Sequence, residues 1–364
     1  MFAAPGPATT TRCVKLRPMP AHDRPPETPP GVRTDVGIEE LRRTPAWLPF
    51  EPLPGNVLRL IQLTEPHYRS ASFLDSRVLQ LHPPEARCAS ATLAAAADGL
   101  VPEAHFVFHI GHVGSTLLAR LVGEHPSVFA LREPALLRAA AAPAGALGDG
   151  LTLTQQVALL SRTWRAEQRA LIKTTSFVSE ISSALLECSP NARALLLFTR
   201  APVYLRAILA GANSRAETRA MAPSRLARLT HRLGRALTPP HREGEWIAMS
   251  WLCEMTALGE TAQRCPAQVQ WMDFEAFLLE PAPALTQALA WFGIPASREW
   301  IDTVLAGPLM HRYSKAPEHA YDPQLRQAVL AQAEREHGAE VRAGLAWLAG
   351  LPQTHPPVAS ALSR

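Results

Sequence analysis

The stretch that decides the fold is residues 106–122, FVFHIGHVGSTLLARLV. It opens with aromatic and β-branched residues, which are typical of a buried strand. A turn containing Gly111 and Gly114 follows, and the leucines after it have the spacing of an amphipathic helix. We expect the turn to bind an anion, because free backbone N–H groups and the helix dipole favour negative charge at a helix N-terminus. Ser115 and Thr116 could add hydroxyl donors; the alternative is an ordinary strand-to-helix connection made of small residues.

This loop departs from the consensus of ATP- and GTP-binding loops, G-x-x-x-x-G-K-[ST]. The run here is GHVGST: the glycines are closer together and no lysine precedes Ser115. Two later strands end in IKTTS and FTR, with basic residues where a magnesium-binding aspartate would be expected. The pattern disfavours a nucleotide kinase or NTPase that uses Mg²⁺. It predicts a site without metal, in which side-chain cations neutralise the anionic oxygens.

The order of elements indicates the fold class. Apolar segments at 105–110, 169–176, 192–200 and 267–275 are expected to be strands, and amphipathic segments between them to be helices. Strands that alternate with helices form a parallel sheet covered on both faces. We therefore predict an α/β protein, a three-layer αβα P-loop fold with a central parallel sheet. An arginine-rich helical region at 203–235 is expected to be broken by Pro223, and a final helix to cover 323–349.

The chain divides into four predicted parts. Residues 1–40 carry eight prolines in their first 30 positions and read as a disordered leader. Residues 41–102 form a small N-terminal lead-in with a strand pair and a short helix near 90–100. Residues 103–352 are the main domain, and 353–364 a flexible tail.

Composition limits the function classes. The net charge of +4 is mild and does not indicate a nucleic-acid partner. The sequence contains no run of 18 or more uncharged apolar residues, so no membrane-spanning helix is expected. The first residues do not resemble a secretory signal. Five scattered cysteines, Cys13, Cys88, Cys188, Cys253 and Cys265, fit free thiols in a reducing compartment. We expect a cytoplasmic protein; the sequence does not indicate its oligomeric state.

Lysine is rare in this chain. Of 36 basic residues only Lys15, Lys173 and Lys315 are lysines. Where a coding bias favours arginine, a remaining lysine suggests a position that needs a compact ammonium instead of a planar guanidinium. Lys15 lies in the predicted leader, so we attach no role to it. Lys173 and Lys315 become candidate functional residues.

Taken together, these motifs resemble the sulfotransferases that use 3′-phosphoadenosine 5′-phosphosulfate (PAPS), in particular the bacterial and tyrosylprotein branches. The run HVGST at 112–116 is similar to the family's phosphosulfate loop, and EHPSVFALREP places Glu133 21 residues after His112, at the spacing of a catalytic base. Lys173 matches the strand lysine that contacts the sulfuryl group. FTRAP is similar to the 3′-phosphate signature, with Arg200 at its arginine, and YSKAP resembles a late loop that closes over the nucleotide, with Ser314 and Lys315. The resemblance covers roughly residues 104–350.

The resemblance implies a P-loop sulfotransferase fold and a metal-independent transfer of the sulfuryl group from PAPS to a hydroxyl or amine of an unknown acceptor. Glu133 would accept the acceptor's proton, and Lys173, His112 and Ser314 would stabilise charge on the transferred group. The resemblance also implies the residues that bind PAPS. The phosphosulfate would contact the loop residues Gly111, His112, Val113, Gly114, Ser115 and Thr116, and the 3′-phosphate would contact Arg200 and Lys315.

Two positions differ from the family pattern. His112 stands where the family has lysine or arginine, and Ile208 stands where a serine is expected eight residues after Arg200. Thr199, Ser214 or Arg215 could supply the missing contact. Two alternatives therefore stay open: a catalytically inactive relative that binds an adenosine phosphate or a protein partner and, less favoured, a metal-assisted nucleotide kinase.

Other candidates have simpler interpretations. His105 and His109 share one face of a strand and are expected to be packing residues, not metal ligands. The arginine-rich run 215–235 is expected to be a solvated helix face, or the mouth of a site for an acidic acceptor. Asp273 and Glu275 are expected to cap a helix.

Overall fold

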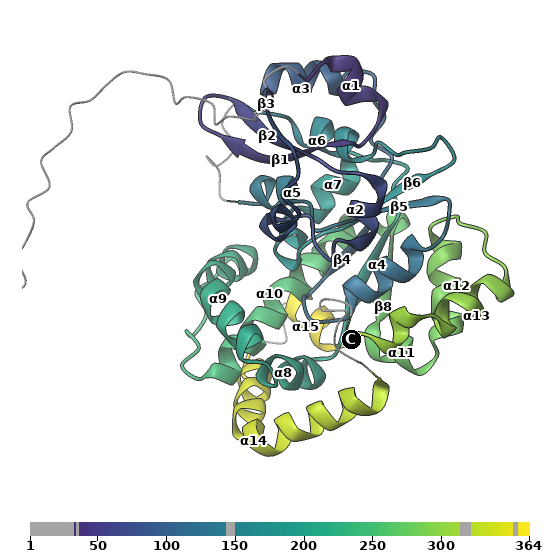
Figure 1. Ribbon diagram of the computed structural model, residues 1–364. Coiled ribbons are helices and arrows are strands. Elements are labelled where there is room, and N and C mark those ends of the chain that lie inside the picture. The colour runs from purple at the N-terminus through teal and green to yellow at the C-terminus, as the bar shows by residue number, and fades with distance from the viewer. Residues whose placement is uncertain (1–32, 34–35, 143–149, 314–321, 352–355) are drawn as a thin grey trace, which may run out of the picture.

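The computed structural model describes residues 33, 36–142, 150–313, 322–351 and 356–364 (Figure 1). Most of the predicted leader and both late-loop candidates, Ser314 and Lys315, lie outside these residues. The statements below concern the described parts of the chain.

The centre of the molecule is a five-stranded sheet in the order β5-β6-β4-β7-β8. Every neighbouring pair in it is parallel. Helices lie on both faces, so the predicted α/β fold with a covered, central parallel sheet is confirmed (Figure 1). The strands are β4 (His105–His109), β5 (Val128–Arg132), β6 (Arg169–Lys173), β7 (Ala194–Phe198) and β8 (Val269–Asp273).

The sequence pattern missed strand β5. Its five residues, VFALR, are buried and pair with β6 along the edge of the sheet. The segment is short and lies between a His-Pro turn and Pro134, so it carries too little periodicity to be distinguished from a loop. β5 ends one residue before Glu133, so this strand positions the predicted catalytic base.

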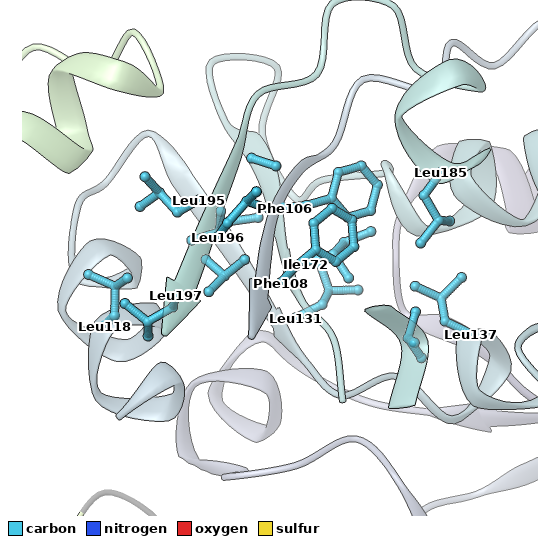
Figure 2. Packing of buried hydrophobic residues seen from close by; sticks show 14 of the residues in the cluster. Phe106, Phe108, Leu118, Leu131, Leu137, Ile172, Leu185, Leu195, Leu196 and Leu197 are labelled. Carbon is cyan, nitrogen blue, oxygen red and sulfur yellow. The ribbon is translucent and has the colours of Figure 1, made fainter. Parts of the chain in front are cut away.

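The core lies on both sides of this sheet. Phe106 and Phe108 of β4 point to one face, with ring centroids 5.2 Å apart, toward Leu137 and Leu185 (Figure 2). Leu197 of β7 lies on the other side with Leu118 of the helix that follows the glycine loop. Side chains that alternate between faces in this way require two covering layers of helices, which is why the strands read as continuous apolar runs.

The helices connect and cover the strands. In the main domain they are α4 (Ser115–Gly123), α5 (Ala135–Ala140), α6 (Leu153–Leu160), α7 (Ser182–Glu187), α8 (Ala201–Leu209), α9 (Ala212–Leu233), α10 (Glu243–Arg264), α11 (Phe274–Leu279), α12 (Pro281–Trp291), α13 (Arg298–Ala306) and α14 (Pro323–Ala349). Short 3₁₀ turns are η1 (Ser76–Leu81), η2 (Ser176–Ile181), η3 (Pro266–Gln268) and η4 (Pro308–His311).

Pro223 does not break the arginine-rich helical region. It lies inside α9, on the exposed side, while the break falls at Gly211 between α8 and α9. A proline removes one helical N–H donor, and on an exposed face water can satisfy the carbonyl that loses its partner. Gly211 has an extended conformation, with φ −122° and ψ 122°, that ends the first helix and starts the second.

The lead-in is a three-stranded antiparallel sheet with three short helices. Its strands are β1 (Trp47–Leu53), β2 (Val57–Gln62) and β3 (Glu85–Ala89), and its helices are α1 (Ile38–Arg43), α2 (Glu65–Ser70) and α3 (Ser90–Ala97). Two buried arginines attach it to the main domain. Arg162 donates to the carbonyls of Leu41, Thr44 and Trp47, and Arg132 to those of Tyr68, Arg69 and Ala71.

The segment assigned to a flexible tail contains a helix. Residues Pro356–Leu362 form α15, in which Val358 and Ala361 are buried. α15 packs on α10, and Arg364 lies over the ring of Trp271 in β8. Apolar burial accounts for its order, since both buried residues belong to the continuous core.

Over the described residues, no helix combines the length and the apolar character needed to cross a membrane.

Candidate functional site

The glycine loop between β4 and α4 is shaped by backbone conformations that favour glycine. Gly111 has φ +87° and Gly114 has φ +65°, both in the left-handed region. A Cβ atom at Gly114 would lie 2.0 Å from the ring of Phe274, so this position has no room for a side chain. The ring of Phe274 packs against the loop at Gly114, and both residues line one cavity.

The two strand histidines, expected to be packing residues, form links to the backbone. The Nδ1 atom of His109 accepts the N–H of Gly111 at 3.0 Å and its Nε2 lies 2.7 Å from the carbonyl of Thr174. His105 makes the same pair of contacts with Arg193 N–H and the Phe292 carbonyl. Burial lowers the pKa of His105 to about 4, which keeps the ring neutral near pH 7.

The first turn of α4 contains one buried hydroxyl group without a hydrogen-bond partner among the described residues. Ser115 and Thr116 are both buried. The hydroxyl oxygen of Thr116 has no hydrogen-bond partner among the described residues. Buried polar groups without partners are rare in native structures. A bound anion would accept a hydrogen bond from this hydroxyl group.

Glu133 and Lys173 meet at the carboxyl edge of the sheet. Lys173 ends β6, Glu133 follows β5, and the ammonium contacts the carboxylate oxygen Oε1 directly. The side chains are 1% and 10% exposed, so this pair is almost fully withdrawn from water. Glu133 has φ +56°, an uncommon conformation for glutamate that orients its side chain toward Lys173 instead of Arg132.

The lead-in contributes one cation, Arg77, to this pair. Arg77, in η1, lies 3.4 Å from Glu133 Oε2 and stacks over the ring of Phe73 at 3.3 Å. Asp75 holds Arg77 through two contacts of 2.8 and 2.5 Å and lies 3.4 Å from Arg138. Burial alone would raise the pKa of Asp75, but the hydrogen bonds from Arg77 outweigh it and the net shift is downward. Arg77 lies outside the segment that resembles sulfotransferases, so no motif pointed to it.

Two cavities adjoin the loop, and His112 lines both. The larger, of about 400 Å³, runs from Ser115 and Thr116 past Phe274 to Arg312 and Arg326. The smaller, of about 120 Å³, contains Glu133. It is also lined by apolar and polar side chains, namely Phe73, Phe177, Tyr204, Met221, Arg77, Arg138 and Arg225.

His112 is held by helix α9. Its Nδ1 atom lies 3.3 Å from the Ser214 hydroxyl and its Nε2 atom 3.6 Å from a carboxylate oxygen of Glu217. His112 itself has φ +54°. The sequence named Ser214 only as an alternative phosphate contact and did not signal Glu217, because both lie about 100 positions away in the chain.

The predicted site residues divide into three groups. Glu133 contacts Lys173 and lines one cavity with Gly111 and His112, whereas Val113, Gly114, Ser115 and Thr116 line the larger cavity, which His112 shares. Arg200 lies at the N-terminus of α8 and lines a separate cavity with Trp251 and Arg364. Ser314 and Lys315 lie outside the described residues, so their roles stay predictions.

The arginine-rich run is not a plain solvated face. Arg225 is 4% exposed and its Nε donates to Glu254 of α10 at 2.9 Å. Arg228 and Arg232 reach Glu180 at 3.1 and 2.6 Å. Asp273, by contrast, caps α11 as expected, by accepting the N–H of Glu275.

Within the described residues, no group of three or more His, Cys, Asp or Glu side chains is arranged to hold a metal ion.

Comparisons with known proteins give structural neighbours only. No protein-family model and no curated protein matches the chain. A sulfotransferase domain from the curacin biosynthetic pathway is 13% identical over 69% of this chain and 98% of its own, with a TM-score of 0.39. A sulfotransferase from Alicyclobacillus acidocaldarius is 15% identical over 67% and 97%, with a TM-score of 0.36. Mouse sulfotransferase SULT7A1, solved with PAP, is 11% identical over 69% and 92%, with a TM-score of 0.34. Similarity at this level does not establish a reaction, so function must come from this chain's own residues.

Proposed function

We propose that this protein is a PAPS-dependent sulfotransferase, which moves a sulfuryl group from PAPS to a hydroxyl or amine of an acceptor. The observation that carries the proposal is the buried Lys173–Glu133 pair beside the glycine loop. A buried acid and a buried ammonium next to an anion-binding loop supply a proton acceptor and a cation for the transferred group.

The two cavities suggest how the substrates divide. The nucleotide would occupy the larger cavity, with its phosphosulfate on the loop N–H groups and on the Thr116 hydroxyl. Arg312 and Arg326 line the same cavity and are cations available to its phosphates. The acceptor would enter the smaller cavity, where Glu133 lies. A volume of about 120 Å³ is close to that of engineered cavities that hold benzene, so one ring-sized group would fit.

The chemistry is an in-line displacement. The acceptor oxygen or nitrogen forms a bond to sulfur while the bond from sulfur to the bridging phosphate oxygen breaks. The proton of the acceptor passes to Glu133, and adenosine 3′,5′-bisphosphate leaves. Lys173 would exchange its contact with Glu133 for the sulfuryl oxygens, so that the carboxylate becomes available to the acceptor. The assignments of Ser314 and Lys315 remain part of this proposal. Arg200 lines a different cavity from the one that would hold the nucleotide, so the geometry does not support its assignment to the 3′-phosphate.

Calorimetric titration with adenosine 3′,5′-bisphosphate tests it. We expect binding that is equal with Mg²⁺ and with EDTA. Thr116→Val should weaken this binding about 10- to 100-fold, the usual contribution of a hydrogen bond to a charged group. Thr303→Val, an exposed residue of α13, is the matched control and should bind normally. Binding of ATP that requires Mg²⁺, with no binding of the bisphosphate, would overturn the proposal in favour of a kinase.

A further inference from the structure

The N-terminus of α9 faces the same cavity as the glycine loop. Gly211 and Ser214, from the start of α9, line the larger cavity together with Gly114, Ser115 and Thr116 from the start of α4. Residues from two helix N-termini therefore line one space, where the positive ends of helix dipoles favour an anion. Ser214 therefore lines the cavity that would hold the phosphosulfate.

A chain of three polar side chains ends at Ser214. Glu217 and Ser214 are three residues apart on α9, so they share one helix face. The His112 ring lies between them, with Nε2 at 3.6 Å from the Glu217 carboxylate and Nδ1 at 3.3 Å from the Ser214 hydroxyl. The His112 side chain is 19% exposed, which limits competition from water.

We propose that Ser214 is a direct ligand of the phosphosulfate and that His112, fixed by Glu217, determines where its hydroxyl proton points. The inference rests on the proposed function and deepens it. When His112 is an imidazolium, Nδ1–H donates to the Ser214 oxygen, and the hydroxyl proton is left to donate to the anion. When His112 is neutral with its proton on Nε2, Nδ1 is an acceptor, and the Ser214 hydroxyl donates its hydrogen bond to Nδ1 instead of to the anion. Ser214 then turns its lone pairs toward the ligand.

Glu217 favours these two forms of the His112 ring over a third form, the neutral ring that carries its proton on Nδ1. A carboxylate near Nε2 favours a proton on that nitrogen, both in the imidazolium and in the neutral ring. A neutral ring with the proton on Nδ1, which would leave Ser214 unaffected by pH, is therefore disfavoured. The arrangement lets histidine serve at a position where a permanent cation would otherwise be expected.

Other charged groups face His112 from the elements around it. In the smaller cavity these are Glu133, Arg77, Arg138 and Arg225; in the larger they are Arg312 and Arg326. Most are engaged elsewhere: Arg77 and Arg138 by Asp75, Arg225 by Glu254, and Arg326 by Glu275. The bound anion adds a further negative charge and favours the imidazolium.

The test is calorimetric titration of the full chain with two probes, adenosine 3′,5′-bisphosphate and inorganic pyrophosphate, from pH 6 to pH 8.5. Ser214→Ala should bind the bisphosphate about tenfold more weakly than the wild type at pH 6 and equally at pH 8.5. Ser214→Thr, which keeps a hydroxyl, should restore binding. Comparison at each pH cancels the titration of the probe itself.

A second variant reports on His112 directly. Glu217→Gln should lower the midpoint of the His112 imidazole titration, followed by NMR, by a few tenths of a pH unit, because a partly exposed ion pair contributes little. Glu299→Gln, an exposed carboxylate on α13, is the control and should leave that midpoint unchanged.

The outcomes separate the two proposals. If Ser214→Ala binds the bisphosphate as the wild type does at every pH, the inference is wrong and the proposed function stands. If the wild type binds pyrophosphate but not the bisphosphate, and Ser214→Ala loses that binding at pH 6, the inference stands and the proposed function fails. Binding of neither probe overturns both.

Discussion

Two buried ion pairs, Lys173–Glu133 and Arg225–Glu254, differ in what surrounds them. Glu254 is fully buried and contacts both Arg225 and Arg228, which belong to a network that includes Arg232, Glu180 and Glu260. In the other pair, Glu133 also lies 3.4 Å from Arg77 and opens on a cavity. Burial lowers the pKa of Arg225, but the Glu254 charge and hydrogen bond outweigh it and the net shift is upward.

The difference teaches how to separate a structural pair from a reactive one. In the helix pair, Glu254 lines neither cavity and contacts two guanidinium groups, so its carboxylate is not available to a substrate, although Arg225 lines the smaller cavity. In the sheet-edge pair, a substrate group can replace one partner at the cavity. The same residue types therefore have different expected responses to substitution.

The largest effect is expected at the sheet edge. Glu133→Gln removes the proton acceptor but keeps the shape of the side chain. Turnover should fall about 10²–10⁴-fold, the usual contribution of a general base. Binding of adenosine 3′,5′-bisphosphate should be retained, and calorimetry beside a turnover assay checks both. Unchanged turnover would show that Glu133 is not the base.

The next effect is expected in the helix pair. Glu254→Gln leaves the guanidinium of Arg225 buried with an uncharged partner, which should lower the free energy of unfolding by about 3–5 kcal/mol. Urea unfolding measures it. The double variant Arg225→Met with Glu254→Met should recover most of the loss, because a buried ion pair can be replaced by apolar side chains at little cost. A loss in the double variant as large as in the single one would contradict this view.

A smaller effect is expected at the ammonium. Lys173→Met keeps the apolar stem and removes the charge that would stabilise the sulfuryl oxygens. We expect turnover to fall about 10²–10³-fold, as for the loss of one donor of an oxyanion hole. Rates at saturating PAPS check this. Intact turnover would mean that the lysine has only a structural role.

The smallest effect concerns a buried group without an ion-pair partner. Burial lowers the pKa of His105 to about 4 from an ordinary value of 6.5. The unfolded chain therefore binds a proton more readily, so this contribution to stability is complete above pH 6.5 and is lost as the pH falls toward 4. The loss should be about 3 kcal/mol.

Urea unfolding at a series of pH values between 7.5 and 4.5 measures this dependence. His105→Asn should flatten it, whereas His82→Asn, at an exposed position, should not. An identical pH dependence in His105→Asn would show that another group is responsible.

The sequence predicted those parts of the fold that follow from local patterns of apolar residues. Four of the sheet strands follow from apolar runs, and the meeting of Lys173 and the glycine loop follows from the geometry of a parallel sheet, whose strands end at one edge. Glu133 was placed near them only by the family resemblance. Strand β5 was missed because five residues beside a proline carry little periodicity. Contacts between distant segments could not be predicted: Arg77, Glu217 and the Arg225–Glu254 pair depend on tertiary packing.

The central claim is that this chain transfers a sulfuryl group from PAPS beside the glycine loop. The most direct measurement incubates the protein, in EDTA, with ³⁵S-labelled PAPS and a panel of small hydroxyl and amine acceptors, together with the Glu133→Gln variant. We predict labelled product and stoichiometric adenosine 3′,5′-bisphosphate from the wild type, and at least about 100-fold less from the variant. Equal labelling by both proteins, or none by the wild type with any acceptor, would contradict it.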